Sequence, residues 1–257
     1  MSKTPNILFL DIESTFNIAG IWGIGKVHLT FENILKEREV SVIGWAWNDE
    51  KVQAEHFNLH KFNLSKYDDD ADKALLEKAI KLIEQADLVV AHNGKYFDVS
   101  VMRSRLAKHN LPDFAPVLID DTYDQTKGIA FNSHKLDYLG RYLGEGRKIE
   151  HGLDLWIGVI KKEKEALEKQ TRYCMGDVEL LRRIYKRLQP YTKSTLNRAI
   201  FDGTVRTCPH CGKEGMLVHR GYRHTSAGKF KKFQCNNCRK YCTVGKNEIV
   251  KPGGYPR

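Results

Sequence analysis

The chain has 257 residues, 41% hydrophobic and 10% aromatic, so it can bury a sizeable core. Its net charge of +10 is uneven, because residues 191–257 carry 14 Lys and Arg against 3 Asp and Glu, and residues 1–190 carry 28 against 29. A concentrated basic segment indicates a polyanionic partner, most often nucleic acid. We find neither an export signal nor an apolar stretch of the roughly 20 residues that span a membrane. We therefore expect no membrane partner and a cytoplasmic location, or one wherever the nucleic acid is.

Residues 7–10 form an apolar run that predicts a buried strand, and Asp11 and Glu13 follow at its end. Residues two apart in a strand share a face. Two like charges on one face resist burial unless a cation lies between them, and a hard divalent metal suits carboxylate oxygens. A pair of solvated carboxylates at a strand end is the alternative that this stretch leaves open.

The remaining pattern up to residue 190 alternates strands with helices, which predicts an α/β domain with a mixed sheet flanked by helices. Expected strands cover residues 26–31, 41–48, 52–57, 88–91 and 116–121, the first three as an antiparallel meander. Expected helices cover residues 68–85, 97–109, 133–143 and, with an interruption, 161–188, while residues 153–160 fit either structure. Candidate linkers at residues 189–191 and 202–203 place the domain boundary near residue 200, which gives domains 1–200 and 201–257.

Two further acidic sites follow in the chain. Asp98 comes after the predicted strand at 88–91, where a helix begins, and Asp177 lies four residues after Tyr173 on one helix face. Taken alone, Asp98 is typical of a helix N-terminus, and Tyr173 with Asp177 is an ordinary helix pair.

Taken together, these residues resemble the ordered motifs of the DEDD superfamily of 3′→5′ exonucleases, in its tyrosine branch. The first motif is Phe9-Leu-Asp-Ile-Glu-Ser-Thr15 and the third is Tyr173-Cys-Met-Gly-Asp177. The second, Asn93-Gly-Lys-Tyr-Phe-Asp98, is similar to that of proofreading domains in family B DNA polymerases. The resemblance covers residues 5–190 and implies an RNase H-like fold. It also implies two Mg²⁺ or Mn²⁺ ions held by Asp11, Glu13, Asp98 and Asp177, with Tyr173 positioning the attacking water.

The activity implied by the resemblance is metal-dependent 3′→5′ exonuclease hydrolysis of DNA, at single-stranded ends, by a two-metal mechanism. A 3′→5′ exoribonuclease and a non-catalytic nucleic-acid-binding adaptor are the alternatives. Asn93 and Phe97 either contact the terminal nucleotide or only shape the turn. The expected partners are DNA, with RNA as the alternative, and candidate proteins of replication or repair.

The last quarter of the chain carries two C-x-x-C pairs, Cys208 with Cys211 and Cys235 with Cys238, separated by 23 residues. This spacing predicts one structural Zn²⁺ in a closed four-thiolate site, whose binding supplies folding energy to a small segment. The segment looks like the basic zinc ribbons of nucleic-acid enzymes. Basic and aromatic side chains around the pairs are candidate substrate contacts, namely Arg220, Tyr222, Arg223, Lys231 and Lys232. A solvated basic surface or a protein-docking module is the alternative.

Overall fold

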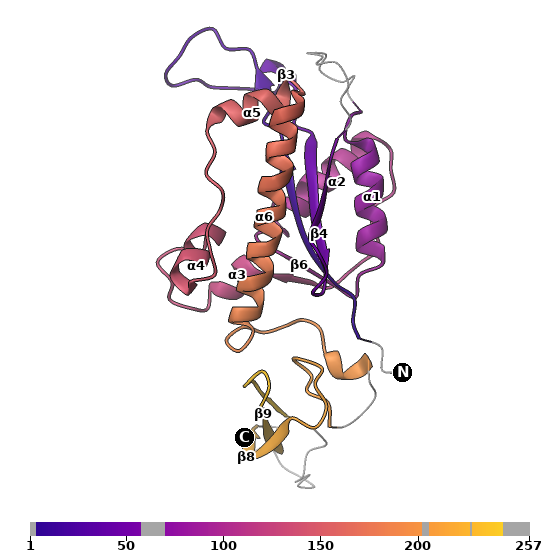
Figure 1. The fold of residues 1–257 in the computed structure, drawn as a ribbon, viewed down its shortest axis with the longest axis vertical. Coiled ribbons are helices and arrows are strands. Elements are labelled where there is room, and N and C mark those ends of the chain that lie inside the picture. Colours follow the sequence, from indigo (N-terminus) through magenta and orange to yellow (C-terminus); the bar gives the residue numbers. More distant parts are fainter. Residues whose placement is uncertain (1–3, 58–69, 202–205, 227, 244–257) are drawn as a thin grey trace. The chain divides into compact units, whose positions relative to one another are not determined.

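The structure is a computed structural model that describes residues 4–57, 70–201, 206–226 and 228–243 (Figure 1). Its contacts divide the chain into a large unit, Asn6–Lys186, and a small unit, Arg187–Arg257 with Met1–Pro5. The predicted boundary near residue 200 falls inside the small unit, and the candidate linker at 202–203 lies outside the described residues. Within the described ranges, no helix has both the length and the apolar character that a membrane span requires.

The large unit is built on a five-stranded mixed sheet with the order β5-β4-β1-β6-β7. The central strand β1 is antiparallel to β4 and parallel to β6, β5 is antiparallel to β4, and β7 is parallel to β6. The strands are β1 (Ile7–Ser14), β4 (Val40–Trp47), β5 (Gln53–His56), β6 (Leu88–Ala91) and β7 (Ile119–Asp121). A separate ribbon pairs β2 (Ile18–Ala19) with β3 (Ile34–Lys36). The predicted mixed sheet of an α/β domain is confirmed.

Helices cover both faces of this sheet. The helices α1 (Lys73–Glu84) and α2 (Asp98–Lys108) lie on one side, and the long helix α6 (Lys164–Leu188) lies on the other (Figure 1). The shorter helices are η1 (Phe31–Asn33), α3 (Thr122–Thr126), α4 (Leu136–Leu143) and α5 (Leu153–Ile160). The residues at 153–160, which fit either structure by sequence, are therefore helical.

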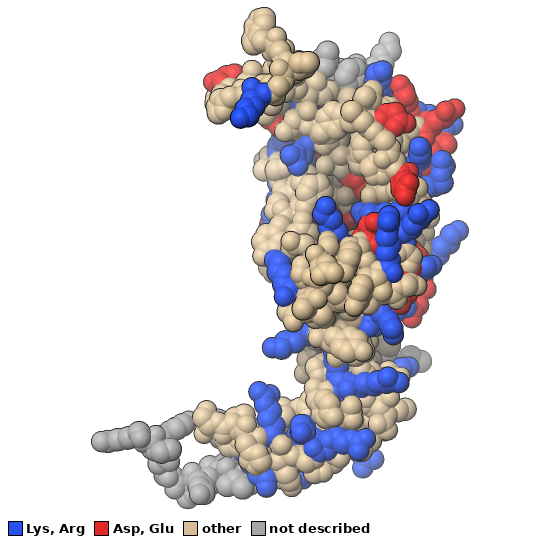
Figure 2. Space-filling view, turned by 90° about the vertical axis from the view of Figure 1, so that its left-hand side faces the viewer, with Lys and Arg blue, Asp and Glu red and all other residues tan. Residues whose placement is uncertain are grey.

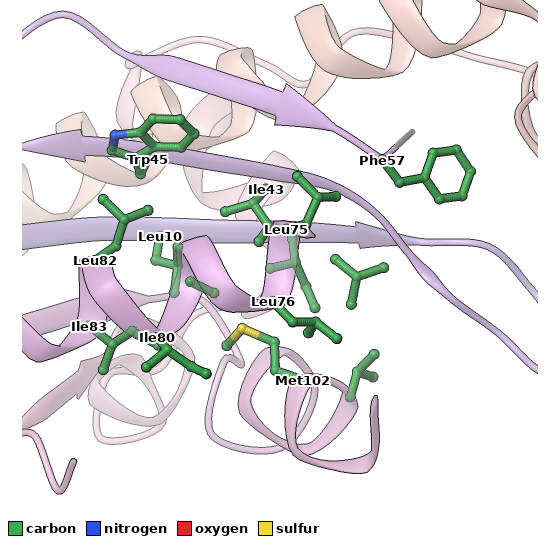
Figure 3. Close-up of a cluster of buried hydrophobic side chains, with 14 of the residues drawn as sticks. Leu10, Ile43, Trp45, Phe57, Leu75, Leu76, Ile80, Leu82, Ile83 and Met102 are labelled. Carbon is green, nitrogen blue, oxygen red and sulfur yellow. The ribbon is translucent and has the colours of Figure 1, made fainter. Parts of the chain in front are cut away.

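The main hydrophobic core lies between the sheet and α1 with α2. The apolar residues of α1 recur at helical spacing and are buried, so one side of the helix packs on the sheet. They meet Leu10, Ile43 and Trp45 from the strands and Met102 from α2 (Figure 3). Burying each such side chain stabilises the fold by about 1.5–3 kcal/mol.

Side chains along β1 alternate between two sides of the sheet, the core side and the side that carries the predicted acidic site. Leu8, Leu10 and Ile12 belong to the core with α1 and α2. The intervening residues face α6, as the Phe9 ring shows by packing edge-on against Tyr185 with centroids 5.7 Å apart. The carboxylates that follow Phe9 at intervals of two residues therefore share the α6 side.

Two predicted elements are wrong. Residues 26–31 form no strand, because β4 itself pairs with β1 and leaves this apolar segment exposed without a partner strand. The interruption predicted within residues 161–188 is absent from Lys164 onward, where α6 runs for 25 residues. Gly176 lies inside this helix, and its position does not break it.

The small unit contains a three-stranded antiparallel sheet with the order β10-β9-β8. Its strands are β8 (Leu217–Thr225), β9 (Gly228–Cys235) and β10 (Tyr241–Thr243), and a short helix η2 (Arg198–Phe201) precedes them. The predicted small C-terminal module thus contains a β-sheet, and Cys235 of the four-cysteine cluster ends its strand β9.

Gly44 is a test of how tightly α6 packs on the sheet. It lies opposite Asp11 in the β1–β4 register, and a methyl group on it would lie 2.7 Å from Cys174 Sγ and 3.0 Å from Val178 Cγ2. Because α6 must shift to make room, we expect Gly44→Ala to lower the free energy of unfolding by about 1–3 kcal/mol.

Urea unfolding followed by tryptophan fluorescence measures this change, since all four tryptophans precede residue 187. Gly128→Ala is the matched control, because its added methyl group would meet nothing within 4 Å. Equal stability of the Gly44 variant and the wild type would show that α6 does not pack against this strand as described.

Candidate functional site

The site is built around the end of β1, where Asp11 and Glu13 lie on the face covered by α6. The neighbouring strand β6 pairs with β1 only as far as Phe9. Beyond that point the N-terminus of α2 takes the place of β6, and Asp98 Oδ1 accepts a 2.9 Å hydrogen bond from Ile12 N–H. This bond joins the first and second acidic motifs directly.

The turn before α2 holds Asp98, the buried first residue of that helix, in place. Asn93 has a left-handed backbone with φ of 62°, and its N–H and that of Lys95 donate to the carboxylate of Asp121 at 2.9 and 3.1 Å. Asp121 ends β7, and its carboxylate also caps α3. It is therefore a positioning residue for the turn.

Helix α6 supplies Tyr173 and Asp177, whose side chains are both buried. Lys148, from the segment between α4 and α5, lies between them. Its Nζ is 2.6 Å from Asp177 Oδ2 and donates a 3.0 Å hydrogen bond to Tyr173 Oη. The backbone of Lys148 is itself held, because its N–H donates to Asp137 Oδ1 at 2.9 Å.

A short chain of rings extends from Tyr173. The imidazole of His151 packs edge-on against the Tyr173 ring with centroids 4.8 Å apart. Trp156 Nε1–H donates to His151 Nδ1 at 3.2 Å. These contacts hold the tyrosine ring in addition to the hydrogen bond that Lys148 donates to its hydroxyl.

The electrostatics of the site are dominated by crowded, poorly hydrated carboxylates. Burial, followed by the charges of Asp98, Glu13 and Asp177, raises the pKa of Asp11 well above its usual range. Burial and then the Asp177 charge raise the pKa of Glu13 to about 8. Burial raises the pKa of Asp98 to about 7, although the hydrogen bond from Ile12 opposes it. The four acids therefore behave as one coupled group.

Lys148 is the cation that balances part of this charge. Burial disfavours its ammonium form, but the charges of Asp177 and Asp11 and the hydrogen bond to Asp177 oppose burial, and the pKa of Lys148 is raised. The pKa of Tyr173 is also raised, by burial and then by the Asp177 charge, so its phenol keeps its proton at neutral pH.

The donor set fits hard divalent cations. Asp11 and Glu13 place carboxylate oxygens within 4.8 Å of each other and of the Cys174 thiol. Asp98 and Asp177 lie near enough for their charges to raise the pKa of Asp11, but they are not part of that close group. Four carboxylates balance the charge of two divalent ions, and their oxygens are the ligands that Mg²⁺ prefers. Their role as ligands stays a prediction.

An open cavity of about 450 Å³ lies at the residues that follow Glu13 in the chain. Ser14 and Thr15 directly follow Glu13, and Trp156 connects the cavity to Tyr173 through His151. The cavity is lined by Ser14, Thr15, Phe16, Asn17, Arg38 and Trp156. Asn17 Oδ1 accepts a 2.8 Å hydrogen bond from Arg38 N–H, which ties two of its walls together.

The small unit brings together the four predicted zinc ligands. Cys208 Sγ is 3.7 Å from Cys238 Sγ, Cys211 Sγ is 3.7 Å from Cys235 Sγ, and all four sulfur atoms lie within 4.8 Å of one another. Four cysteine sulfurs in this arrangement are the donor set of a structural Zn²⁺. Cys242 does not belong to the cluster, and His210 Nε2 instead lies 3.1 Å from Tyr241 O.

The predicted substrate contacts are only partly brought together. Asn93 and Phe97 flank the turn before Asp98, and Phe97 is 37% exposed. In the small unit, Tyr222 pairs with Lys231 on one face of the hairpin, so the adjacent residues Arg223 and Lys232 point to the other face. Arg220 lies in a β-bulge between the two regular stretches. The part of the small unit that faces the viewer in Figure 2 shows Lys and Arg but no Asp or Glu.

Lys148, His151 and Asp121 are site residues that sequence reasoning missed. Lys148 and His151 lie between helices, in a segment without periodicity, and no motif marks them. Asp121 could have been singled out as the polar end of a predicted strand parallel to β1, because parallel strands bring their carboxyl ends to one edge.

The raised pKa values predict how the metal-free protein responds to pH. Between about pH 4 and pH 8 the carboxyls of the site bind more protons in the folded state than in the unfolded state, where their pKa values are ordinary, and below about pH 6.5 the lowered pKa of His92 opposes this effect. Stability should therefore fall as the pH rises through this window, by up to about 1.4 kcal/mol per pH unit for each such proton. Urea unfolding at several pH values without added Mg²⁺ or Mn²⁺ measures the trend.

Asp98→Asn should make this decline shallower near pH 7, because it removes one raised carboxyl and keeps an acceptor for Ile12. Asp113→Asn, at an exposed ion pair with Arg103, serves as the control and should leave the decline unchanged. A stability that stays flat or rises between pH 5 and pH 8 would contradict the crowded site.

Comparison with known proteins agrees with this fold. The profile of the RNase H superfamily matches residues 8–189. The family B DNA polymerase from the hyperthermophilic archaeon Pyrobaculum calidifontis is similar in structure, with a TM-score of 0.53 and 11% sequence identity. The similarity covers 90% of this chain and 32% of the polymerase chain, so this chain spans about a third of that protein. Comparison with curated proteins gives no match. Because the profile covers most of its length, the chain belongs to the RNase H superfamily.

Proposed function

We propose that this protein is a metal-dependent 3′→5′ exonuclease that hydrolyses DNA phosphodiester bonds at single-stranded ends. The observation that carries the proposal is the convergence of Asp11, Glu13, Asp98 and Asp177, with Tyr173 beside them, on one cluster. These residues come from β1, α2 and α6, separated by more than 70 residues at each step. A cluster of like charges is costly for a fold to maintain unless cations bind there.

Two Mg²⁺ or Mn²⁺ ions, when bound to these carboxylates, would provide the nucleophilic hydroxide and neutralise charge on the phosphate and the leaving 3′-oxygen. The chain itself prepares the nucleophile. The hydroxyl of Tyr173 accepts from Lys148 and also hydrogen-bonds to the Asp177 carboxylate, so it is held beside the proposed metal ligands. Because its pKa is raised, this phenol remains a donor at neutral pH and can orient a water molecule.

Lys148 has two tasks in this proposal. It sets the direction of the Tyr173 hydroxyl through the 3.0 Å hydrogen bond, and it places a fixed positive charge next to Asp177. A positive charge at this point also favours the approach of a phosphate group to a cluster that is otherwise negative.

The adjoining cavity is suited to the terminal nucleotide. Phe16 and Trp156 offer aromatic surface for a base, and Arg38 offers a guanidinium for a phosphate. Ser14 and Thr15 connect this cavity to Glu13 along the chain.

The central experiment follows a 5′-labelled single-stranded DNA oligonucleotide with and without Mg²⁺. We expect a ladder of products shortened from the 3′ end only when Mg²⁺ is present. Asp98→Asn should lower the rate on the order of a thousandfold, because it removes a metal ligand. Asp113→Asn, an exposed acid outside the cluster, should keep the wild-type rate.

The same assay separates the alternatives. Faster degradation of an RNA oligonucleotide of the same sequence would identify an exoribonuclease. Binding of either strand without any Mg²⁺-dependent product would identify a non-catalytic adaptor, and an active Asp98→Asn variant would remove the proposed site.

The cavity gives a separate prediction. Phe16→Ala should raise KM for single-stranded DNA about tenfold with a smaller effect on kcat, because it removes a stacking surface but no reacting group. Phe31→Ala is the matched control, since this side chain is 72% exposed and lies outside the cavity. Initial rates over a range of substrate concentrations measure both values, and equal KM values for the two variants would argue against a base in this cavity.

A further inference from the structure

The hairpin of the small unit contains a β-bulge that changes which residues share a face. His219 pairs with Phe233 and Tyr222 pairs with Lys231, so β8 advances three residues while β9 advances two. The extra residue lies in Arg220-Gly221, and Gly221 has a φ of 81° that favours glycine. Strict alternation would place His219 and Tyr222 on opposite faces. The bulge places them on the same one.

The resulting face carries a connected row of rings. The His219 ring packs edge-on against Tyr222, with centroids 5.4 Å apart, and against Phe233, with centroids 5.5 Å apart. Lys229 Nζ lies 3.9 Å from the centroid of the Tyr222 ring, which fixes the orientation of this ring. We name as the aromatic face the side chains of His219, Tyr222, His224, Lys229, Lys231 and Phe233.

The opposite face of the same sheet lacks such a row. It carries Arg223, Phe230, Lys232 and Tyr241. Lys232 Nζ lies 5.7 Å from the centroid of the Tyr241 ring. The two faces therefore have similar charge, and they differ in whether rings are gathered together.

The charge around the hairpin suits a polyanion. No Asp or Glu occurs from residue 215 to residue 243, whereas the same stretch contains Arg220, Arg223, Lys229, Lys231, Lys232, Arg239 and Lys240. Joined rings flanked by lysines are the arrangement that binds unpaired bases by stacking while ammonium groups contact the backbone phosphates. A protein partner of ordinary charge would not need a surface free of acids.

We propose that the aromatic face is a binding platform for single-stranded nucleic acid, with a base stacked on Tyr222 and a phosphate at Lys231. This inference rests on the proposed function, because it assigns the strand that the nuclease degrades to a particular face of the small unit. The opposite face then has no part in binding beyond its general positive charge.

The test measures binding of the full chain to fluorescent single-stranded oligonucleotides by anisotropy, in an Asp98→Asn background so that hydrolysis does not interfere. Tyr222→Ala should weaken binding about tenfold, and Tyr222→Phe should restore it because the ring is kept. Lys231→Ala should reduce the slope of log Kd against log salt by about 0.7. The matched controls on the opposite face, Tyr241→Ala and Lys232→Ala, should have less than about a third of these effects.

One bound zinc per chain, measured for every variant, shows that the four-cysteine cluster has formed and that the sheet is intact. DNA and RNA oligonucleotides are compared, because a stacking surface has no group that selects the 2′-hydroxyl. Unchanged binding in Tyr222→Ala would overturn the proposal. Equal losses of affinity from substitutions on the aromatic face and on the opposite face would overturn it as well. Face-specific binding by a protein without nuclease activity would uphold the platform and refute the exonuclease, so the two failures can be told apart.

Discussion

The structure of the large unit depends on holding several carboxylates together in a place with little water. Asp98 and Asp177 are buried, and burial is the leading cause of the raised pKa in every member of the cluster. Mutual repulsion adds to this cost, and the single ammonium of Lys148 cannot balance four acids. The cluster is therefore a feature that the remaining structure must support, and its energetic cost is itself an argument that cations bind there.

Support comes from the way three elements meet at the end of β1. Because β6 stops pairing with β1 after Phe9, the N–H of Ile12 can donate to Asp98. The backbone of β1 thus provides the hydrogen bond that holds the N-terminus of α2. The absence of a side chain at Gly44 lets α6 approach the same strand from the other side. The backbone of β1 thus carries two acids of its own and positions the third, while close packing of α6 brings the fourth.

The sequence predicted the parts of this arrangement that local pattern controls. Apolar runs located β1 and β6, and helical spacing located α1 and α2. The four acids were singled out by the resemblance of three ordered motifs to a family, since each motif alone is also typical of ordinary strand ends and helices. Prediction from the sequence failed where the outcome depends on a distant partner. Residues 26–31 have strand-like composition but no strand to pair with, and Lys148 acquires its importance only when α6 places Tyr173 and Asp177 beside it. The bulge at Gly221 likewise cannot be predicted from the alternation of side chains along a strand. Each residue of β8 after the bulge lies on the face opposite to the one that strict alternation predicts.

The two units of the chain offer different kinds of metal-binding side chain. The small unit offers four thiols, which suit zinc, and the large unit offers carboxylates, which suit magnesium or manganese. Cys174 is the exception, because its sulfur lies 3.7 Å from Asp11 Oδ2 inside the carboxylate cluster. Burial, followed by the charges of Asp11 and Glu13, raises the pKa of this thiol well above its usual range. A thiol that keeps its proton is a poor ligand, since zinc binds the thiolate. The acids of the proposed metal site therefore also suppress the soft donor that lies beside them, which agrees with the proposal of hard divalent ions.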